Sequence, residues 1–519
     1  MDMNSLNNPS NYPHAVSKVE WRETHISWVI LTGEFVYKIK KPVDFGFVNF
    51  SSIDLRKSYC EEEVRLNRRT APALYLGVVS LCENHGQLNF SGQGQVVDYA
   101  VKMRQFDPDA LLSSVLKNHS PSKGFIQTLA YDLARFHGQA IAAGNDFDVV
   151  GSVTLPVVEN FRQIKQLDSL VESDVHKLLD TLEVWSLTAL KNLEPTFYQR
   201  HKRNRIKECH GDLHLGNIAV VDENPLMFDC IEFNDQFRWI DCASDLAFLI
   251  MDLEFHGYPD IANDVLNRYL EYSLDYHCLS VMDFYKVYRA MVRAKVALLA
   301  ASQAEPGTEP MRSAQKEFNE YVQFAADSIP EKSPFLVLTS GVSGTGKSTF
   351  ATEFCAYSDS IHIKSDVVRK RLAGLAPTDN SEDVPGLNLY SEDSSQRTFA
   401  KLHELASFLL GLGYGVVVDA TFLTVQDREP FLKLARDRGI AVVIAHLMAP
   451  EEVLGARIEH RLQLGLDSSE ATVAVMGEQL KRVEGFNRLE KNCVIEIDNA
   501  LKQDNFNVIM ATLGQPRAT

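Results

Sequence analysis

The sequence lacks the features that mark secreted, membrane-spanning or disulfide-linked proteins. Its longest apolar runs, such as residues 247–251, are far shorter than the roughly 20 residues that a membrane-spanning helix needs. Residues 1–14 are polar and have neither the basic start nor the apolar core of a secretory signal. The eight cysteines include no Cys-x-x-Cys pair, which favours buried, reduced thiols over a disulfide framework or a zinc site. We therefore expect a cytoplasmic protein with no membrane partner.

An excess of positive charge is also missing. The chain has 69 acidic and 52 basic residues among 519, which gives a formal net charge of −17. This balance disfavours nonspecific binding to nucleic acid, whose phosphates carry the same sign of charge. The 45% of hydrophobic residues is typical of globular proteins, and the length is enough for several compact units. We expect small-molecule partners and no nucleic-acid partner.

The clearest motif is residues 341–349, which read Gly-Val-Ser-Gly-Thr-Gly-Lys-Ser-Thr. It follows a predicted strand over residues 335–338 and opens a predicted helix, and its glycines let successive N–H groups turn inward around an anion. Lys347 is expected to reach the β- and γ-phosphates of ATP, and Ser348 to place its hydroxyl on Mg²⁺. A plain glycine-rich turn would not need that lysine and serine. The expected ATP-binding residues are Gly341, Ser343, Gly344, Thr345, Gly346, Lys347, Ser348 and Thr349.

The segments that follow this motif predict a doubly wound α/β domain with a parallel sheet. Four apolar segments alternate with helical ones and predict strands, over residues 361–364, 416–418, 441–447 and 494–497. Ligands of such sheets gather at the carboxyl ends of the strands, which is where Asp366 and Asp419 fall. We expect Asp366 to accept the proton of an acceptor hydroxyl while Arg369 holds negative charge. Asp419 is expected to support Mg²⁺, directly or through water.

Two arginines further along the chain complete this predicted site. Arg457 and Arg461 are four residues apart and share a helix face, as a lid that closes cations over phosphates requires. We count Lys347 and Arg461 among the catalytic candidates because both place positive charge near the transferred phosphate. Residues 333–513 resemble the small P-loop kinases of the gluconate kinase and zeta-toxin type. The resemblance implies transfer of the γ-phosphate of ATP to a small molecule.

The N-terminal part begins with a predicted β-hairpin over residues 25–40, joined by a Thr-Gly turn. In its second strand Lys38 and Lys40 are two residues apart and share one face, where one of them is expected to contact the α- and β-phosphates of a nucleotide. A solvated basic edge strand is the alternative. The helix predicted over residues 56–69 offers Glu63 as the preferred partner of that lysine.

A second chemical centre spans residues 209–217, which read Cys-His-Gly-Asp-Leu-His-Leu-Gly-Asn. Asp212 and Asn217 are five residues apart, and Asp229 lies twelve residues further on, after a short apolar run. Phosphoryl transfer requires a set of this kind, with one base and two Mg²⁺ ligands. The two histidines of the run would suit zinc, but the hard oxygen ligands beside them suit Mg²⁺ better.

In this run the sequence resembles the aminoglycoside phosphotransferase-like branch of the protein-kinase fold, in which His-Gly-Asp replaces the kinase His-Arg-Asp. The resemblance covers roughly residues 16–328 and is strongest over residues 208–252. It implies an α+β bilobal domain that binds ATP, although no full glycine-rich loop is visible in the N-terminal lobe. The residues that it assigns are the base Asp212, the Mg²⁺ ligands Asn217 and Asp229, the pair Lys38 and Glu63, and the structural aspartates Asp241 and Asp245.

The domain boundary is predicted within residues 329–334, where two prolines interrupt the helical periodicity. This gives a kinase-like domain over residues 1–330 and a P-loop domain over residues 331–519. The chain then resembles bacterial proteins that fuse two such domains. We predict an ATP- and Mg²⁺-dependent phosphotransferase with two nucleotide sites that acts on hydroxyls of small molecules. The alternative is a P-loop ATPase switch that regulates, or is regulated by, a ligand-binding kinase-like module.

Overall fold

The structure is a computed structural model that describes residues 3–44, 48–331, 333–381, 384, 388–464, 469–497 and 502–515. The chain separates into two compact units, each made of two stretches of sequence. The first unit contains Met1–Phe255 and Val281–Ser328, and the second contains His256–Ser280 and Ile329–Thr519. The domain limits 1–330 and 331–519 stay a prediction, and Lys332 of the predicted linker lies outside the described residues. The assignment of residues 256–280 to the second unit was not predicted.

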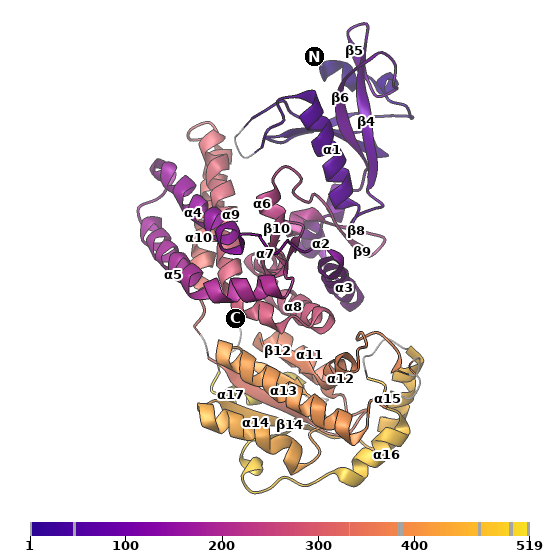
Figure 1. Ribbon diagram of the computed structural model, residues 1–519, viewed down its shortest axis with the longest axis vertical. Helices are drawn as coiled ribbons and strands as arrows, with labels where there is room; N and C mark the ends of the chain where they lie inside the picture. Colours follow the sequence, from indigo (N-terminus) through magenta and orange to yellow (C-terminus); the bar gives the residue numbers. More distant parts are fainter. Residues whose placement is uncertain are drawn as a thin grey trace. The chain divides into compact units, whose positions relative to one another are not determined.

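The first unit begins with a six-stranded antiparallel sheet in the order β1-β2-β3-β6-β4-β5. Its strands are β1 (Glu20–Glu23), β2 (Ser27–Leu31), β3 (Phe35–Lys40), β4 (Tyr75–Asn84), β5 (Gln87–Asn89) and β6 (Gln95–Arg104). Helix α1 (Ile53–Asn67) packs on this sheet, with Cys60 and Val64 against Val36 and Val101 (Figure 1). Strand β3 pairs with β2 on one side and β6 on the other, so the alternative of a basic edge strand is wrong.

The rest of the first unit is mainly helical. Its elements are α2 (Leu112–Asn118), α3 (Lys123–Gln139), α4 (Val149–Gln166), α5 (Val175–Lys202), β7 (Ile206–Glu208), β8 (Ile218–Val221), β9 (Asn224–Met227), α6 (Asp235–Arg238), β10 (Trp239–Asp241), α7 (Cys242–Phe255), α9 (Leu279–Gln303) and α10 (Glu309–Asp327). Strand β7 pairs with β10 and β8 pairs with β9, so two short ladders hold the loop of residues 209–217 between them. A small sheet with one helix, followed by a helical lobe, is the predicted α+β bilobal fold, and this prediction is confirmed.

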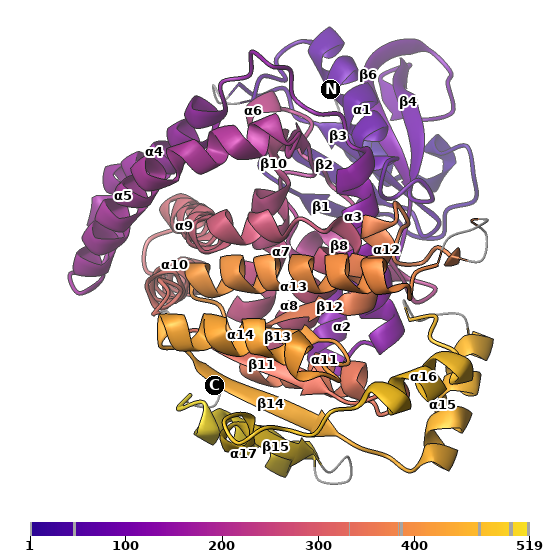
Figure 2. The same cartoon turned by 60° about the horizontal axis from the view of Figure 1, so that its bottom comes forward.

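The second unit is built on a five-stranded parallel sheet in the order β12-β13-β11-β14-β15. Its elements are α8 (Pro259–Ser273), β11 (Phe335–Ser340), α11 (Lys347–Ser358), β12 (Ile361–Lys364), α12 (Ser365–Leu372), α13 (Glu392–Leu412), β13 (Val416–Asp419), α14 (Val425–Arg438), β14 (Ala441–Leu447), α15 (Glu451–Leu464), α16 (Val473–Arg482), β15 (Val494–Ile497) and α17 (Lys502–Thr512). Helices α13 and α14 cover one face, and α11 packs with α17 on the other (Figure 2). The predicted doubly wound parallel sheet is therefore confirmed.

Helix α8 closes the outer edge of this sheet with side chains in place of a further strand. Asn267 Oδ1 accepts from the N–H of His362 at 2.7 Å, and Asn267 Nδ2 donates to the carbonyl of Ser360 at 3.0 Å. Asn263 Nδ2 also donates to that carbonyl, at 3.2 Å. Because buried backbone groups at a sheet edge need partners, these amides complete the hydrogen bonding of β12. The P-loop sheet thus depends on a segment that precedes it by about 70 residues in sequence.

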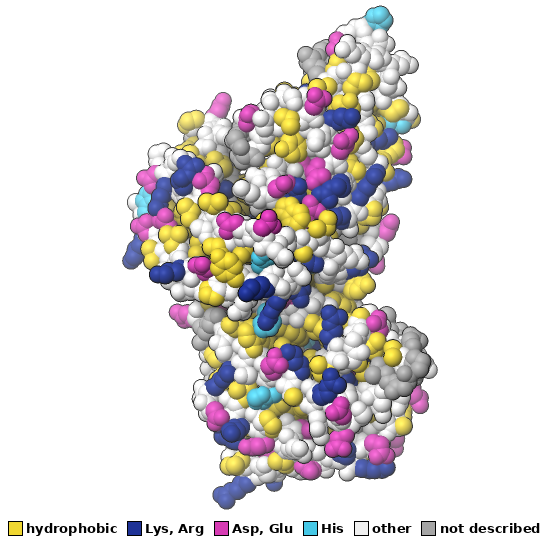
Figure 3. All heavy atoms as spheres, in the orientation of Figure 1, with side chains coloured by type: hydrophobic (Ala, Val, Ile, Leu, Met, Phe, Trp, Pro, Cys, Tyr) yellow, Lys and Arg dark blue, Asp and Glu magenta, His cyan; other side chains and the backbone are white. Residues whose placement is uncertain are grey.

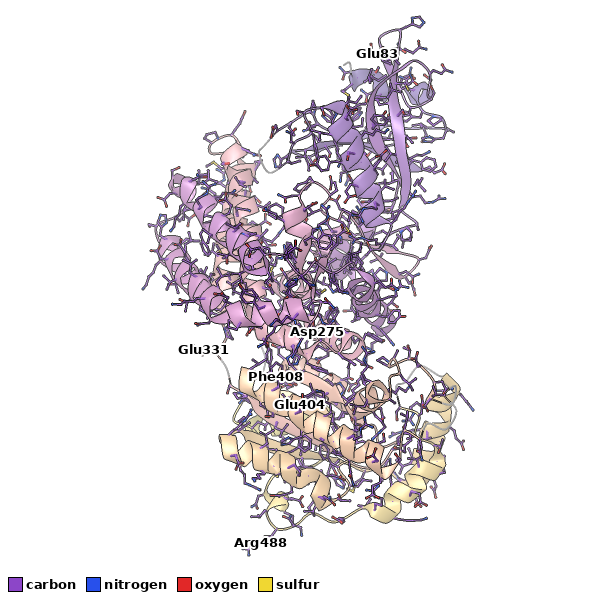
Figure 4. All side chains as sticks on the ribbon, in the orientation of Figure 1. Glu83, Asp275, Glu331, Glu404, Phe408 and Arg488 are labelled. Carbon is purple, nitrogen blue, oxygen red and sulfur yellow. The ribbon has the colours of Figure 1, made fainter. Side chains whose placement is uncertain are left out.

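The residues after α8 anchor the same segment to helix α13. The ring of His277 packs against Phe408 with centroids 4.6 Å apart, and Figure 4 labels Phe408 and Asp275 at this junction. The Tyr414 hydroxyl donates to the carbonyl of Leu279 at 3.3 Å. Residues 256–280 are therefore held to the second unit by both polar and aromatic contacts.

We predict that Asn267→Ala loosens β12 and destabilises the second unit by about 1–3 kcal/mol, because it leaves the buried His362 amide without an acceptor. Hydrogen exchange of the His362 amide measures the effect directly, and exchange should become faster at β12 before it does at β14. Asp260→Asn, at an exposed position of the same helix, is the matched control and should change exchange little. Unchanged protection of His362 in the alanine variant would show that α8 does not support the sheet edge.

No helix in the described part of the chain is long and apolar enough to cross a membrane. On the face drawn in Figure 3, Lys and Arg side chains are intermixed with Asp and Glu side chains. The excess of acidic residues in the composition is thus spread among basic ones on that face.

Candidate active sites

The phosphate loop of the second unit has the backbone that its glycines predict. Gly341, Gly344 and Gly346 have φ angles of 142°, 89° and 92°, in the region that favours glycine. A Cβ atom on Gly341 would lie 2.4 Å from the carbonyl oxygen of Leu447, so a side chain does not fit there. Gly346 then starts helix α11, whose first N–H groups point out of its N-terminal end. This conformation is suited to holding phosphate oxygens.

Lys347 lies within the loop that it follows in sequence. Its ammonium donates to the carbonyl of Val342 at 2.9 Å, and the residue is buried. Burial lowers the pKa of Lys347, and the carboxylates of Asp419 and Asp366 oppose this decrease. Ser348, the next residue, is exposed at the mouth of the loop. The lysine is therefore a buried cation beside the phosphate cradle, as the motif predicts.

Asp419 ends strand β13 beside the loop. Its Oδ2 lies 3.3 Å from Nε2 of His362 on β12, and its Oδ1 accepts from the Thr339 hydroxyl at 3.4 Å. Burial by itself raises the pKa of Asp419, but the hydrogen bond from His362 and the charge of Lys347 outweigh it, and the pKa falls to about 2. The carboxylate is therefore ionised at neutral pH and offers oxygens that suit Mg²⁺. His362 was not predicted, because nothing in its local sequence distinguishes it from a core residue of a strand.

Asp366 and Arg369 occupy the first turns of helix α12, at the end of strand β12. Arg369 Nη1 donates to Asp366 Oδ1 at 2.5 Å, and the guanidinium lies 4.9 Å from the ring centre of Tyr390. Helical spacing of three residues places both side chains on one face. The predicted base thus has a fixed cation beside it, which can balance charge as a proton is taken up.

Helix α15 contributes both predicted arginines. Arg457 donates to the carbonyl of Gly344 at 3.3 Å, and Arg461 donates to the carbonyl of Ala471 at 2.6 Å. They line one pocket of about 670 Å³ together with most of the predicted residues. Those shared residues are Ser343, Gly344, Gly346, Lys347, Ser348, Thr349, Asp366, Arg369 and Asp419. Gly341 and Thr345 lie behind the lining, where Thr345 donates to the carbonyl of Val342 at 2.9 Å.

Lys364 also lines this pocket and was not predicted. It is the last residue of β12, and its ammonium donates to Glu271 of helix α8 at 2.6 Å. The carboxylates of Glu271 and Asp419 overcome the effect of burial and raise the pKa of Lys364. Helix α8 therefore supports the sheet edge and also holds a cation of the pocket.

In the first unit, the His-Gly-Asp run is held by one buried carboxylate. Asp245 of α7 accepts from the N–H groups of His210 and Gly211, each at 2.9 Å. Gly211 has φ 89°, and a Cβ there would lie 2.6 Å from the carbonyl oxygen of Phe237. Arg289 Nη1 donates to the carbonyl of Gly211 at 2.9 Å. These bonds fix the backbone immediately before Asp212.

Asp212 and Asn217 contact each other. Asn217 Nδ2 donates to the Asp212 carbonyl at 2.9 Å and to its Oδ2 at 3.1 Å. Burial by itself raises the pKa of Asp212, but the charges of His214 and Arg293 outweigh it, so the pKa lies below its usual range. The amide of Asn217 uses its N–H groups on Asp212, which leaves Oδ1 as its group for a metal. Asn217 and the half-exposed Asp229 thus provide the oxygen ligands that Mg²⁺ prefers.

The structure gives the histidines of the run other partners than zinc. His210 Nε2 lies 2.9 Å from the carbonyl oxygen of Phe228, and its Nδ1 accepts from the N–H of Asp212 at 3.3 Å. His214 Nδ1 accepts from the N–H of Gly216 at 3.1 Å. The preference for Mg²⁺ over zinc at this run stays a prediction.

Lys38 and Lys40 both reach Glu63 from one face of β3. Lys38 Nζ lies 2.9 Å from Glu63 and 2.6 Å from Asp229, while Lys40 lies 2.7 Å from Glu63 and also contacts Glu232. The side chain of Lys38 is 15% exposed and that of Lys40 is fully buried. Only Lys38 therefore joins the α1 carboxylate to the predicted Mg²⁺ ligand. Glu232 was not predicted, although two lysines beside one glutamate call for a second acid.

Replacing each lysine by methionine in turn should distinguish the role of Lys38 from that of Lys40. Lys40→Met leaves Glu232 without a cation in a buried site and should destabilise the first unit by about 3–5 kcal/mol. Lys38→Met should cost less stability, because Lys40 still neutralises Glu63, and should mainly weaken ATP binding. All four tryptophans lie in the first unit, so tryptophan fluorescence in a urea titration reports on it. Equal losses of stability would mean that the lysines have the same structural role.

The predicted residues of the first unit meet at one cleft of about 780 Å³. Lys38, Asp212 and Asp229 line it, and Glu63 and Asn217 contact these residues from behind. Helices α4 and α9 supply much of the remaining wall. The cleft therefore brings together the predicted base, the predicted lysine and the predicted Mg²⁺ ligands.

The chain joins a protein-kinase-like phosphotransferase fold to a P-loop kinase fold. The AAA domain family matches residues 336–486, which contain the phosphate loop and Asp419. The chain belongs to the family of two mycobacterial proteins, "Uncharacterized protein Rv2004c" of Mycobacterium tuberculosis (H37Rv) and "Uncharacterized protein Mb2027c" of Mycobacterium bovis. It is 31% identical to each over 462 residues, which cover 88% of this chain and 89% of each relative. The predicted succession of a kinase-like fold and a P-loop fold is confirmed by the architecture of the two units and by the family match at residues 336–486, and the two relatives match most of the chain.

Solved structures resemble each part of the chain in fold. A gluconokinase from Sinorhizobium meliloti 1021 is 20% identical and covers 36% of this chain and 94% of its own, with a TM-score of 0.25. The ADP-bound aminoglycoside phosphotransferase APH(2'')-Ib is 12% identical and covers 63% of this chain and 99% of its own, with a TM-score of 0.36. Plasmodium vivax ethanolamine kinase Pv091845 is 12% identical and covers 59% and 82%, with a TM-score of 0.36.

Proposed function

We propose that the protein is an ATP- and Mg²⁺-dependent phosphotransferase with two nucleotide sites, each of which transfers a γ-phosphate to a hydroxyl of a small molecule. The observation that carries the proposal is that one pocket of the second unit contains Lys347, Ser348, Asp366 and Asp419 together. A phosphate cradle, a carboxylate for a metal and a separate carboxylate for a proton are what phosphoryl transfer requires. Magnesium, when bound, would neutralise charge on the transferred phosphate.

In the second unit, the proposed roles follow from where each side chain lies. The loop N–H groups and Lys347 bind the phosphates, and Ser348 and Asp419 hold Mg²⁺. Asp366 takes the proton of the acceptor hydroxyl as the oxygen attacks phosphorus, and Arg369 balances the charge of the base. Arg461, from the other side of the pocket, stabilises charge on the transferred phosphate.

In the first unit, we assign the base to Asp212, since its carboxylate is ionised and lies at the cleft. The Asn217 bonds orient this carboxylate, and Asp245 holds the backbone before it. Asn217 and Asp229 hold Mg²⁺, and Lys38, paired with Glu63, binds the α- and β-phosphates. Most of the proposed catalysis is positioning and electrostatic stabilisation, because the phosphoryl group needs no covalent enzyme intermediate.

One observation favours a second candidate function, in which the P-loop unit is an ATPase switch. Glu271 binds Lys364 of the P-loop pocket, yet it lies on a segment that connects α7 and α9 of the first unit along the chain. Nucleotide at the pocket could therefore change α8 and, through it, the ends of both helices. In that case hydrolysis would be slow and no acceptor would be phosphorylated by the second unit.

The proposal is tested by incubating the full chain with γ-labelled ATP, Mg²⁺ and a mixture of small hydroxy compounds. We expect labelled products that form with Mg²⁺ and disappear when EDTA removes it. The variants Lys347→Ala and Lys38→Met should each remove a different product. Labelled inorganic phosphate without any labelled organic product would favour the ATPase switch.

A further inference from the structure

Helix α9 presents one side to the cleft of the first unit. Tyr285, Arg289, Val292 and Lys295 all line the cleft, at the spacing of three to four residues that one helix face requires. Arg289 marks the part of this row nearest to Asp212, because it donates to the carbonyl of Gly211, the residue before Asp212. Lys295 lies six residues further on, which corresponds to about 9 Å along a helix.

Every carboxylate that lines this cleft already has a partner of its own. Four of them pair with basic residues: Asp229 with Lys38, Glu232 with Lys40, Asp241 with Arg200, and Glu159 with Arg162. The fifth, Asp212, accepts from Asn217 and lies 3.5 Å from His214. The acidic charge of the cleft is therefore largely balanced within the protein.

The two cations of α9 that line the cleft, Arg289 and Lys295, are not balanced in this way. Arg289 donates hydrogen bonds to the carbonyls of Gly211 and Ser244 and to the Ser244 hydroxyl. It pairs with no carboxylate among the described residues. Lys295 has no hydrogen-bond or ion-pair partner in the described ranges of the chain. The carboxylate that acts on the pKa of Lys295 is that of Glu159, and Glu159 itself forms an ion pair with Arg162. Since partly buried charges are costly when unpaired, this lysine is suited to an anion from outside.

Two further polar atoms on the same walls also lack partners. Asn160 Nδ2 on α4 and the Tyr285 hydroxyl on α9 are buried and have no hydrogen-bond partner within the described structure. Both residues line the cleft and are 2% exposed. Buried polar groups normally have partners, so these two groups call for acceptor atoms supplied by a ligand. Carboxylate and phosphate oxygens accept several such bonds.

We propose that the acceptor of the first unit carries a carboxylate or phosphate group in addition to its reacting hydroxyl, and that Lys295 binds this anionic group. Asn160 of α4 contributes a hydrogen bond to the acceptor. Tyr285, about 15 Å from Lys295 along the helix and on the other side of Arg289, contributes another nearer the reacting hydroxyl. The proposal rests on the proposed function of the first unit and names the class of its substrate. The spacing of Lys295 from Arg289 places the anionic group several ångströms from the hydroxyl that reacts near Asp212. A hydroxy acid or a sugar phosphate fits these requirements, and a polyamine does not.

The test uses the full chain with Lys347→Ala, which silences the P-loop site. Product formation is measured for matched acceptors that differ in one group: gluconate and sorbitol, glucose 6-phosphate and glucose, glycerol 3-phosphate and glycerol, with glucosamine as the cationic counterpart of glucose. We expect transfer to one or more anionic members and not to their neutral or cationic counterparts. The carboxylate and phosphate arms separately identify which of the two anions is bound.

Lys295→Gln should then raise the KM for the anionic acceptor by about 10- to 100-fold and leave the KM for ATP unchanged, because one charged hydrogen bond is lost. Lys295→Arg should restore most of the affinity. Lys191→Gln removes the same charge at an exposed position of α5 and is the matched control.

Two results would overturn the inference, and they are distinguishable. Asp212-dependent transfer to neutral or amine acceptors, unaffected by Lys295→Gln, would exclude the anion subsite and leave the phosphotransferase function in place. If no acceptor is phosphorylated in an Asp212-dependent way, the proposed function of the first unit fails, and the subsite fails with it.

Discussion

Replacing Asp366 by asparagine should lower phosphoryl transfer by the second unit by about 10²- to 10⁴-fold, the usual contribution of a general base. ATP affinity should stay close to that of the wild type, because the phosphates are bound by the loop and Lys347 and not by helix α12. The amide keeps the shape of the carboxylate and can still accept from Arg369, so the fold of α12 should be preserved. Single-turnover transfer to the acceptor and nucleotide binding, measured on the same preparation, separate the two effects.

Two further variants define this result. Lys347→Ala should weaken nucleotide binding as well as transfer, which is a different pattern. Asp393→Asn changes an exposed carboxylate on the neighbouring helix α13 and should change neither quantity. If Asp366 serves only to orient Arg369, then Arg369→Lys should reduce transfer as strongly as Asp366→Asn does. Unchanged turnover in Asp366→Asn would remove this residue as the base.

The phosphate loop could be predicted from the sequence because its physical requirements are local. Gly341, Gly344 and Gly346 must adopt positive φ angles, Lys347 must follow the loop directly, and α11 must begin there. Each of these requirements is visible in consecutive residues. The same holds for the run from His210 to Asn217, whose turn and base lie within eight residues. The strands of the P-loop sheet and the hairpin of β2 and β3 were predicted to within a few residues, because short apolar segments bounded by turns are a local signal. The short strands β7, β8 and β10 beside the run were not predicted.

Partners from distant parts of the chain could not be predicted in this way. Lys38 and Lys40 are equivalent by strand periodicity, and only the position of Asp229, 191 residues away, distinguishes them. Glu232 has no motif of its own, so the second acid that a buried lysine pair requires was missed. Arg289 and Lys295 lie on a helix whose apolar spacing predicts only a packed core.

Helix α8 is the feature that the sequence conceals most completely. Its residues continue the helical pattern of the first unit, and nothing in their composition indicates that Asn263 and Asn267 bind the edge of another sheet. Side-chain amides that take the place of a strand produce no alternating pattern in the sequence. Only two residues, four apart on a helix, make the hydrogen bonds that a neighbouring strand would otherwise make. The prolines of the predicted linker indicated one boundary. They gave no indication that residues 256–280, which precede the linker, belong to the second unit.

The assignment of residues 256–280 to the second unit is relevant to coupling between the two candidate sites. Because α8 belongs to the second unit and is flanked in sequence by α7 and α9 of the first, the units are joined by three connections, and not by a single tether. Glu271 and Asp245 lie on the two helices on either side of one such connection, and each holds part of a candidate site. Coupling between the sites is therefore a property to measure, by comparing nucleotide affinity at one site with and without ligand at the other.

Asp212→Asn should abolish phosphoryl transfer by the first unit, with a decrease of about 10²- to 10⁴-fold, and leave transfer by the second unit intact. The substitution is isosteric, and the Asn217 bond to the Asp212 carbonyl is a backbone contact that it preserves. Stability followed by tryptophan fluorescence should therefore change little, as expected for a partly exposed side chain. Asp222→Asn, in the turn between β8 and β9, is a control of the same charge that lies outside the cleft lining.

The pH dependence of this difference follows from the lowered pKa of Asp212. A carboxyl whose folded pKa lies below its ordinary value of 3.8 is fully ionised at every pH above about 5, and its charge is lost only as the pH falls through the folded pKa. The ratio of wild-type to Asp212→Asn activity should therefore stay constant between about pH 5 and 8. A ratio that falls steadily on acidification within that range would mean that the group taking the proton titrates near neutrality. His214 would then be the first residue to replace, because its ring lies 3.5 Å from the Asp212 carboxylate.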